Sequence, residues 1–197
     1  MLEFMARPRT HDHHVRRRLL ETASAAIAAG GVPALSLRAT AEEAATTTAA
    51  VYSLFGSREA LIAAVVEEGF RRFGAHLAEV EQTHQPAEDL IALGVAYRAN
   101  ALQNPHFYRV MFAPASADIA AGTGEDTFGV LVEGVARAAC CDDAQARKRA
   151  QRLWAYVHGL VSLELAHLVP DTSDAGEAEA SYVAALRAAA SLISEAA

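Results

Sequence analysis

The chain has little cysteine, little lysine and no long apolar run. Its only two cysteines among 197 residues are adjacent, Cys140 and Cys141, so they cannot staple distant parts of a fold. This pattern favours a reducing, cytoplasmic setting and two ordinary helix cysteines; a redox or metal-binding role is the alternative. No apolar run approaches the roughly 20 residues that span a bilayer, and the charged N-terminus lacks the apolar segment of a secretory signal. We therefore expect no membrane partner.

Alternation with period two is also missing, which argues against a sheet. Hydrophobic residues make up 52% of the chain, as in a globular protein, and the six prolines fall mostly between segments. Val15, Leu19, Ala23 and Ile27 recur at helical spacing along one face. The sequence predicts an all-α fold of about nine helices, with an N-terminal three-helix domain (1–57) and a larger C-terminal helical domain (58–197).

The expected helix ends follow from capping residues. Ser36, Thr47 and Ser57 each precede a helical segment and can accept a first-turn N–H, and Asp142 or Asp143 can cap a later one. Gly30 and Gly31 stop the first helix. We expect residues 113–124, rich in Ala, Gly, Ser and Asp, to form a loop. The expected helical segments are 12–29, 36–44, 47–54, 58–80, 87–103, a short aromatic piece to 112, 125–140, 142–168 and 177–194.

Charge is unevenly distributed along the chain. The net charge is −7, yet residues 1–18 hold five arginines against two acidic residues, whereas residues 61–197 hold 10 basic and 18 acidic side chains. One end can approach phosphate while the rest repels it, which would orient the molecule on DNA. The alternative is a basic tail that only aids solubility.

Residues 36–61 have the layout of a helix-turn-helix. Two short helices are joined by the turn Ala45-Thr46, and the second helix would present its N-terminal residues to base edges in the major groove. No Arg, Asn or Gln stands there, so bidentate base pairing is missing and backbone positioning and shape should carry much of the recognition. A small three-helix core with a threonine-rich surface turn is the alternative. The expected DNA-binding residues are Arg38, Thr46, Thr47, Thr48, Ala49, Tyr52 and Arg58. Of these, Tyr52 and Arg58 are phosphate candidates, Arg38 is a phosphate or base-edge candidate, and the threonines can also bond phosphate.

Several fixed spacings resemble the N-terminal domain of the TetR family of transcriptional regulators over residues 15–65. The matching residues are Leu37-Arg38, Ala41-Glu42-Glu43-Ala44, Ala49-Ala50-Val51-Tyr52 and Phe55-Gly56-Ser57-Arg58-Glu59-Ala60-Leu61. Further along, Trp154-Ala-Tyr-Val-His158-Gly159 and the segment HFYRVMF resemble a branch of the family with a Trp-x-x-x-His-Gly signature.

The chain departs from the family pattern at two positions. The family usually has a glycine in the helix-helix turn, where this sequence has Ala45; either the alanine is left-handed at a cost of about 1 kcal/mol, or the turn takes another shape. The family also usually buries an aliphatic residue where Thr40 stands, so its hydroxyl needs a partner. Both departures affect the expected docking angle of the domain on DNA.

The resemblance implies a homodimer that binds a near-palindromic double-stranded DNA operator as a repressor. Two recognition helices about 34 Å apart would read one face of the duplex. The last two long helices should pack against their mates as a four-helix bundle, although the core of a monomer would give similar stripes. The expected interface residues are Tyr156, Leu160, Tyr182, Val183, Leu186, Ala190 and Ile193.

The resemblance also implies a small-molecule effector, whose identity the sequence does not give. A large apolar pocket with one or two polar groups suits a hydrophobic ligand, and the alternative is that these rings only fill the core. The expected lining residues are Tyr97, Phe107, Tyr108, Met111, Phe112, Phe128, Trp154 and His158.

Two alternatives to DNA binding are an enzyme, such as one with a helical di-metal site, and a binding module of the same fold. The spacings Glu81 to His84 and Glu164 to His167 match one element of helical di-metal sites, but no further inward glutamates complete such a site. No phosphate loop, dinucleotide fingerprint or nucleophile elbow occurs either, so we expect no enzyme and no cofactor. A module of the same fold that binds a small molecule or protein without DNA is the remaining alternative.

Overall fold

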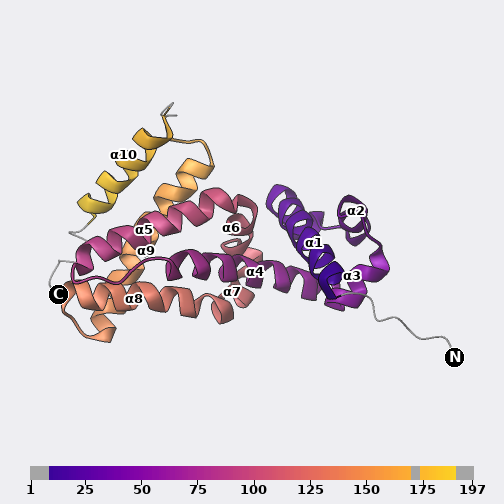
Figure 1. Ribbon diagram of the computed structural model, residues 1–197, viewed down its shortest axis with the longest axis horizontal. Coiled ribbons are helices and arrows are strands. Elements are labelled where there is room, and N and C mark those ends of the chain that lie inside the picture. Colours follow the sequence, from indigo (N-terminus) through magenta and orange to yellow (C-terminus); the bar gives the residue numbers. More distant parts are fainter. Residues whose placement is uncertain (1–8, 170–173, 190–197) are drawn as a thin grey trace. The chain divides into compact units, whose positions relative to one another are not determined.

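The computed structural model describes residues 9–169 and 174–189, and within them the chain is all-α, as predicted (Figure 1). No single helix of these residues is long and apolar enough to cross a bilayer; the bent pair α3–α4 passes on length and composition alone. The α-helices are α1 (Arg9–Gly30), α2 (Leu37–Glu43), α3 (Thr48–Phe55), α4 (Arg58–Ala78), α5 (Pro86–Gln103), α6 (Pro105–Met111), α7 (Ala117–Thr123), α8 (Glu125–Ala139), α9 (Asp143–Leu165) and α10 (Ala175–Ala188), and the 3-10 helices are η1 (Val32–Ala34) and η2 (Pro114–Ser116).

The predicted N-caps are present. The Ser36 hydroxyl accepts a hydrogen bond from the Ala39 N–H at 3.4 Å, and Ser57 accepts from the Ala60 N–H at 3.0 Å. Asp142 caps α9 through the Gln145 N–H at 2.9 Å. Each bond satisfies a backbone donor that has no partner inside its own helix, which fixes where the helix begins.

The loop predicted for residues 113–124 is wrong. This segment forms η2 and α7, because Pro114 occupies the first position of a 3-10 turn and the alanine-rich stretch after it favours helix. A smaller difference is that α9 ends at Leu165 rather than near Leu168. His167 is left-handed (φ 54°), and the Leu168 N–H bonds back to the Leu163 carbonyl at 3.0 Å, which closes the helix.

The chain divides into two compact units. The N-terminal unit comprises the described residues up to Arg71 together with His106–Thr123, and the C-terminal unit comprises Arg72–Pro105 and the described residues from Gly124 onward. The functional division after residue 57 remains a prediction.

The core of the N-terminal unit joins α1, α4 and α6. Leu19, Leu61 and Val65 are fully buried, and Phe107 and Met111 are 2% and 1% exposed. Gly69 allows the close approach, because a Cβ there would stand 2.6 Å from the Met111 Cγ. A segment from beyond position 105 therefore completes this core.

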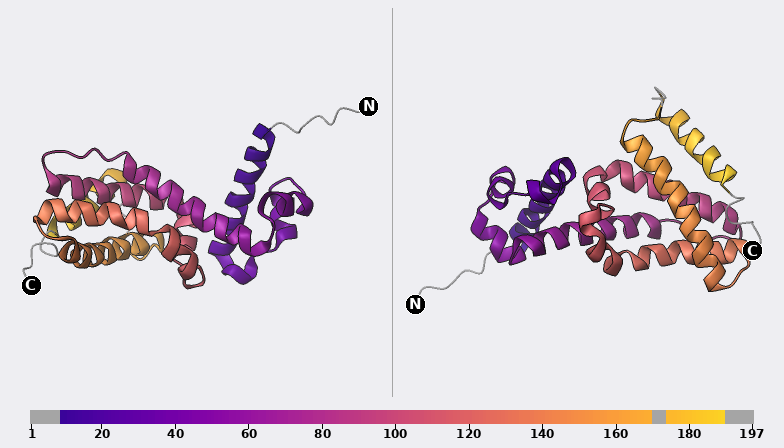
Figure 2. Two further views of the ribbon diagram at one scale, coloured as in Figure 1. Left: turned by 90° about the horizontal axis from the view of Figure 1, so that it is seen from below. Right: turned by 180° about the vertical axis from the view of Figure 1, so that it is seen from behind.

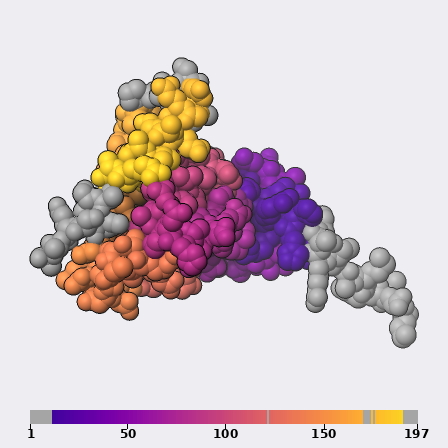
Figure 3. Space-filling model, turned by 60° about the vertical axis from the view of Figure 1, so that its left-hand side comes forward, coloured from indigo at the N-terminus to yellow at the C-terminus, as the bar shows by residue number. Residues whose placement is uncertain are grey.

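The C-terminal unit is built from α5, α8 and α9, which lie side by side in Figure 2, with α10 against α5 (Figure 3). Gly94 makes room for α10, since a Cβ there would meet the Leu186 side chain at 2.7 Å. The Tyr182 hydroxyl donates to the Gly94 carbonyl at 2.9 Å, and Arg187 pairs with Glu88 at 2.8 Å. One small residue and two polar contacts thus hold α10 in place.

Candidate DNA-binding surface and regulatory residues

The turn between α2 and α3 is a Schellman motif with an alanine at its left-handed position. Ala45 has φ 50°, the Ala45 N–H bonds to the Glu42 carbonyl at 3.0 Å, and the Thr46 N–H bonds to the Ala41 carbonyl at 2.8 Å. Of the two alternatives left open by the sequence, the structure thus shows the left-handed alanine rather than a turn of another shape. The motif ends α2 and directs the chain into α3.

One face of α3 is buried and the opposite face is open. Val51 is 1% exposed, and Thr40 of α2 is 2% exposed within the same small core. The Thr47 hydroxyl caps α3 by accepting from the Ala50 N–H at 3.2 Å. Of the predicted DNA-binding residues on this helix and its cap, Thr47, Ala49 and Tyr52 are exposed, and Thr46 and Thr48 are half-buried. The surface formed by residues 46–49 and 52 is called the recognition face below.

Arg58 and Arg38 differ in their surroundings. The Arg58 Nε donates to the Leu35 carbonyl at 3.1 Å, and one Nη donates to the Val32 carbonyl. The structure thus gives Arg58 a bracing role between α4 and η1, which the phosphate role predicted from sequence did not anticipate. Arg38 is exposed near the start of α2 and keeps the predicted role as a proposal.

A second arginine brace, which the sequence did not predict, joins α1 to the end of α2. The Arg18 Nε donates to the Ala44 carbonyl at 2.9 Å, so α1 holds the last residue before the left-handed Ala45. Arg16 lies over the Phe55 ring, 5.2 Å from its centre. Arginines 16–18 give a basic signal in sequence, but nothing in the sequence indicates that one of them reaches a helix end 26 residues away.

The residues predicted to line one effector pocket fall into both units. The N-terminal unit holds Phe107, Tyr108, Met111 and Phe112, and the C-terminal unit holds Tyr97, Phe128, Trp154 and His158. In the N-terminal unit, Phe112 meets Phe70 edge-on at 6.2 Å and Tyr108 at 5.0 Å. These rings pack against one another as core residues do.

The four residues of the C-terminal unit form a continuous chain of contacts. The Tyr97 hydroxyl lies 3.0 Å from the His158 Nδ1, and Trp154 lies 5.9 Å from the His158 ring and 6.1 Å from Phe128. Burial lowers the pKa of His158, so the neutral imidazole is favoured. This chain, from Tyr97 to Phe128, is called the aromatic relay below, and it offers one polar pair within apolar surroundings.

A groove of about 900 Å³ lies elsewhere in the C-terminal unit, along the end of α4 and one face of α5. Its lining includes Ala92, Val95 and Ala96 of α5 together with Glu79 and Glu81. None of the predicted effector residues lines this groove. The sequence did not point to it, because its lining contains no Phe, Tyr or Trp.

The predicted dimer interface divides into inward and outward residues. Tyr182 and Leu186 are each 7% exposed and contact Gly94 of the same chain, so their assignment to the dimer surface is corrected. The stripe on α10 is the core-facing side of that helix. Tyr156, Leu160 and Val183 are half-buried and stay in the proposal, whereas Ala190 and Ile193 lie outside the described residues.

The spacings weighed as metal sites are not arranged as ligands. Glu81 and His84 are exposed in the segment between α4 and α5 rather than on a helix, and Glu164 pairs with Arg98, its Oε2 2.8 Å from the Nε. Within 9–169 and 174–189, no group of three or more His, Cys, Asp or Glu side chains is placed to hold a metal ion.

Two family models match this chain. Residues 19–65 match the bacterial regulatory proteins of the tetR family, and residues 90–190 match the tetracyclin repressor-like C-terminal domain. The second match covers half of the chain. No curated protein matches in sequence.

Several solved structures share the fold. A TetR-like transcriptional regulator from Rhodococcus sp. RHA1 aligns with a TM-score of 0.71 at 16% identity, over 88% of this chain and 93% of that one. A protein of unknown function from Rhodococcus sp. RHA1 is 27% identical over 95% of this chain and 98% of its own, with a TM-score of 0.68. The TetR family regulator PfmR from Thermus thermophilus is 18% identical over 86% and 97%, with a TM-score of 0.67.

Proposed function

Because the chain belongs to the TetR family of transcriptional regulators, we propose that it is a dimeric, cytoplasmic repressor that lays α3 in the major groove of a near-palindromic operator. The observation that carries the proposal is the recognition face. It is exposed on α3, and Val51 on the opposite side of this helix is buried in the core. The Schellman turn at Ala45 sets the direction of α3 relative to α2. A protruding helix on a braced support is what groove binding requires.

Recognition rests on phosphate contacts and duplex shape. The small side chains of Thr48 and Ala49 let the helix approach the bases closely, and the exposed Tyr52 hydroxyl reaches toward phosphate. Arg38 adds a charged phosphate contact from α2. The threonine methyl groups supply apolar contact to the methyl groups of thymine.

Dimerisation is proposed through α9 and α10. Leu163 on α9 is 45% exposed, and Leu168, just after the helix, is 72% exposed. Together with the half-buried Leu160 and Val183, they form an apolar surface whose burial against a second copy removes it from water.

The effector is proposed to be a small hydrophobic molecule with one group that can hydrogen-bond. The aromatic relay supports this, because Tyr97 and His158 supply one donor and one acceptor among rings. A ligand that displaces their mutual hydrogen bond would shift α5 relative to α9. The assignment to the Trp-x-x-x-His-Gly branch likewise stays a proposal.

Selection of bound duplexes from a random DNA library tests the proposal. The expected product is an inverted repeat whose half-sites are about 10 base pairs apart, or a multiple of that spacing. A Thr47→Ala/Tyr52→Ala double variant should lose most of the affinity, whereas Gln151→Ala, an exposed change on α9, should bind as the unaltered protein does. A library without enrichment, or a double variant with unchanged affinity, would contradict DNA binding through this face.

A further inference from the structure

The two cysteines occupy an accessible turn that neither the recognition face nor the aromatic relay uses. Cys140 follows the end of α8 and is exposed, and Cys141 is half-buried before the N-cap of α9. Both are free thiols. Cys140 adopts a left-handed conformation (φ 48°, ψ 44°), which strains a non-glycine residue by about 1 kcal/mol. A thiol thus stands where glycine is the usual helix terminator.

Adjacency decides what this pair of thiols can do. The Cα atoms of neighbouring residues are about 3.8 Å apart across a trans peptide bond, whereas an unstrained disulfide needs roughly 4.4–6.8 Å. A direct S–S bond of about 2.05 Å would therefore be strained. An atom bonded to both sulfurs lets them stand further apart and relieves that strain. The spacing favours chelation of one thiophilic atom over oxidation.

The surroundings limit which atom fits. A structural zinc ion needs four protein ligands, and among the described residues no third His, Cys, Asp or Glu is placed to join a metal cluster here. A two-coordinate linear metal would need the sulfurs on opposite sides, which adjacent residues cannot provide. A pyramidal centre that brings its own third substituent needs only two neighbouring thiols.

We propose that Cys140 and Cys141 form a chelating site for a trivalent, monosubstituted arsenical. With an arsine oxide, R–As=O, the two thiol protons and the oxide oxygen leave as one water molecule. Two As–S bonds form, the As–R bond is kept, and arsenic stays trivalent, so no oxidant is required. The product is a ring that includes both sulfurs and the peptide bond between the two cysteines.

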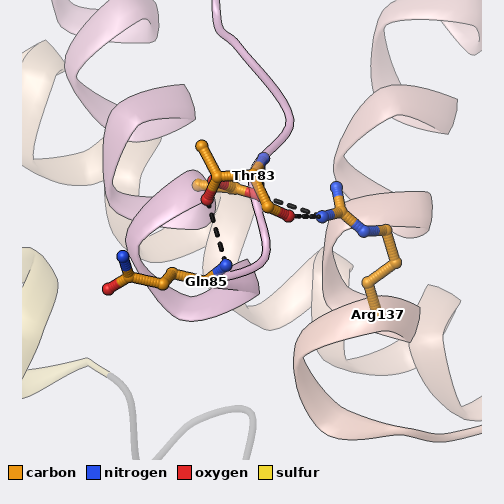
Figure 4. Close-up of polar contacts among 4 residues, drawn as sticks. Thr83, Gln85 and Arg137 are labelled. Carbon is orange, nitrogen blue, oxygen red and sulfur yellow. Dashed lines mark hydrogen bonds and ion pairs between the residues drawn. The ribbon is translucent and has the colours of Figure 1, made fainter.

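The site is connected to the rest of its unit through α8. The Cys140 thiol lies 3.7 Å from the Arg137 carbonyl. The Arg137 guanidinium donates to the Thr83 carbonyl at 2.8 Å (Figure 4). It also donates to the Asp89 carboxylate at 2.9 Å. Because Arg137 is occupied by these groups, its charge does not pair with the thiols. Closing the ring would change the backbone one turn after the residue that ties α8 to the start of α5.

The test uses the reduced full-length protein and phenylarsine oxide as the probe. Intact-mass spectrometry should show one phenylarsenic group per chain, and thiol titration should fall from two free thiols to none. The adduct should survive a millimolar monothiol and be removed by 2,3-dimercaptopropanol. Two linked thiols should retain the arsenical at least about 100-fold more tightly than one.

Three variants separate chelation from chance reactivity. Cys140→Ser and Cys141→Ser should each release the probe to the monothiol. Cys140→Gly removes a thiol but accepts the left-handed backbone without strain, so its thermal transition should be no lower than that of the unaltered chain, and it should still lose retention. Retention by either serine variant equal to that of the unaltered chain would overturn the proposal, as would release from the unaltered chain by the monothiol alone. None of these measurements depends on DNA binding.

Discussion

The two units are specified by interactions of different range. In the N-terminal unit, the Thr47 cap, the Ser36 cap and the turn around Ala45 are each formed by hydrogen bonds between residues no more than five apart in sequence. In the C-terminal unit the contacts that position helices join residues far apart, such as Tyr97 with His158 and Gly94 with Tyr182. Local hydrogen bonds set helix ends, whereas distant contacts set how the helices pack.

This difference teaches where each unit is vulnerable. A lost cap removes one bond at a helix end and costs about 1 kcal/mol. A lost core contact leaves a cavity and costs several times more. The N-terminal unit needs both kinds, because Met111 and Phe107 complete its core from a segment that follows Gln103 in the chain.

The largest expected effect is that of Met111→Ala. Met111 is 1% exposed and packs on Gly69, so its truncation should lower the free energy of unfolding by about 2–5 kcal/mol. Urea denaturation measures the loss. Leu102→Ala, at a side chain that is 40% exposed, serves as the control and should cost far less. If Met111→Ala lowered the free energy of unfolding no more than the Thr47→Ala cap variant, distant contacts would not contribute more to stability than local ones.

Arg58→Ala and Arg38→Ala separate bracing from phosphate binding. Loss of the two Arg58 bonds to the Leu35 and Val32 carbonyls should destabilise the fold by about 2–3 kcal/mol, because charged donors contribute more than neutral ones. Arg38→Ala should leave stability within about 0.5 kcal/mol but weaken DNA binding and reduce the salt-dependence slope by about 1. Thermal unfolding and binding at several salt concentrations measure both. If Arg58→Ala left the stability unchanged, the bracing role would be wrong and the phosphate-binding role would be favoured.

Ala45→Gly sharpens the local side of the comparison. Glycine takes a φ of 50° without steric cost, so the variant should be more stable by about 0.5–1 kcal/mol. The same change at Ala39, an exposed position inside α2, should destabilise by about 0.5–1 kcal/mol. Denaturation midpoints of the two variants, measured in parallel, show whether each change raises or lowers the stability. Destabilisation by both changes would mean that the turn strain is negligible.

The smallest expected effect concerns His158 and pH. Burial holds its pKa below the ordinary value of about 6.5, so below that pH the unfolded chain binds the proton more readily than the folded chain. The stability from the neutral imidazole is therefore complete above about pH 6.5 and is lost as the pH falls through the lower folded pKa. His158→Gln should flatten the stability profile as the pH falls below about 6.5, which urea denaturation at several pH values measures. Identical slopes in His158→Gln and the unaltered chain would exclude this coupling.

Sequence predicted the helical class and the caps because these depend on neighbouring residues. The same locality explains the error at 113–124, where turn-forming residues were given more weight than the alanine-rich helix that they flank. Helical spacing also predicted the apolar stripe on α10, but such a stripe does not show whether it packs within the chain or against a second copy. Tyr182 and Leu186 bind within the chain because Gly94 leaves the space for them.

By itself the sequence determined the helical class and the capped starts of α2, α3, α4 and α9, since capping bonds and apolar spacing act over about three to five residues. Only the tertiary structure decided that Arg58 and Arg18 serve as braces, that the predicted effector residues fall into two units, and that α10 turns its aromatic face inward. Those outcomes depend on side chains meeting across 23 to 88 residues of chain. Packing of whole helices brings such side chains together, and a periodic pattern records only that a face is buried, not what buries it.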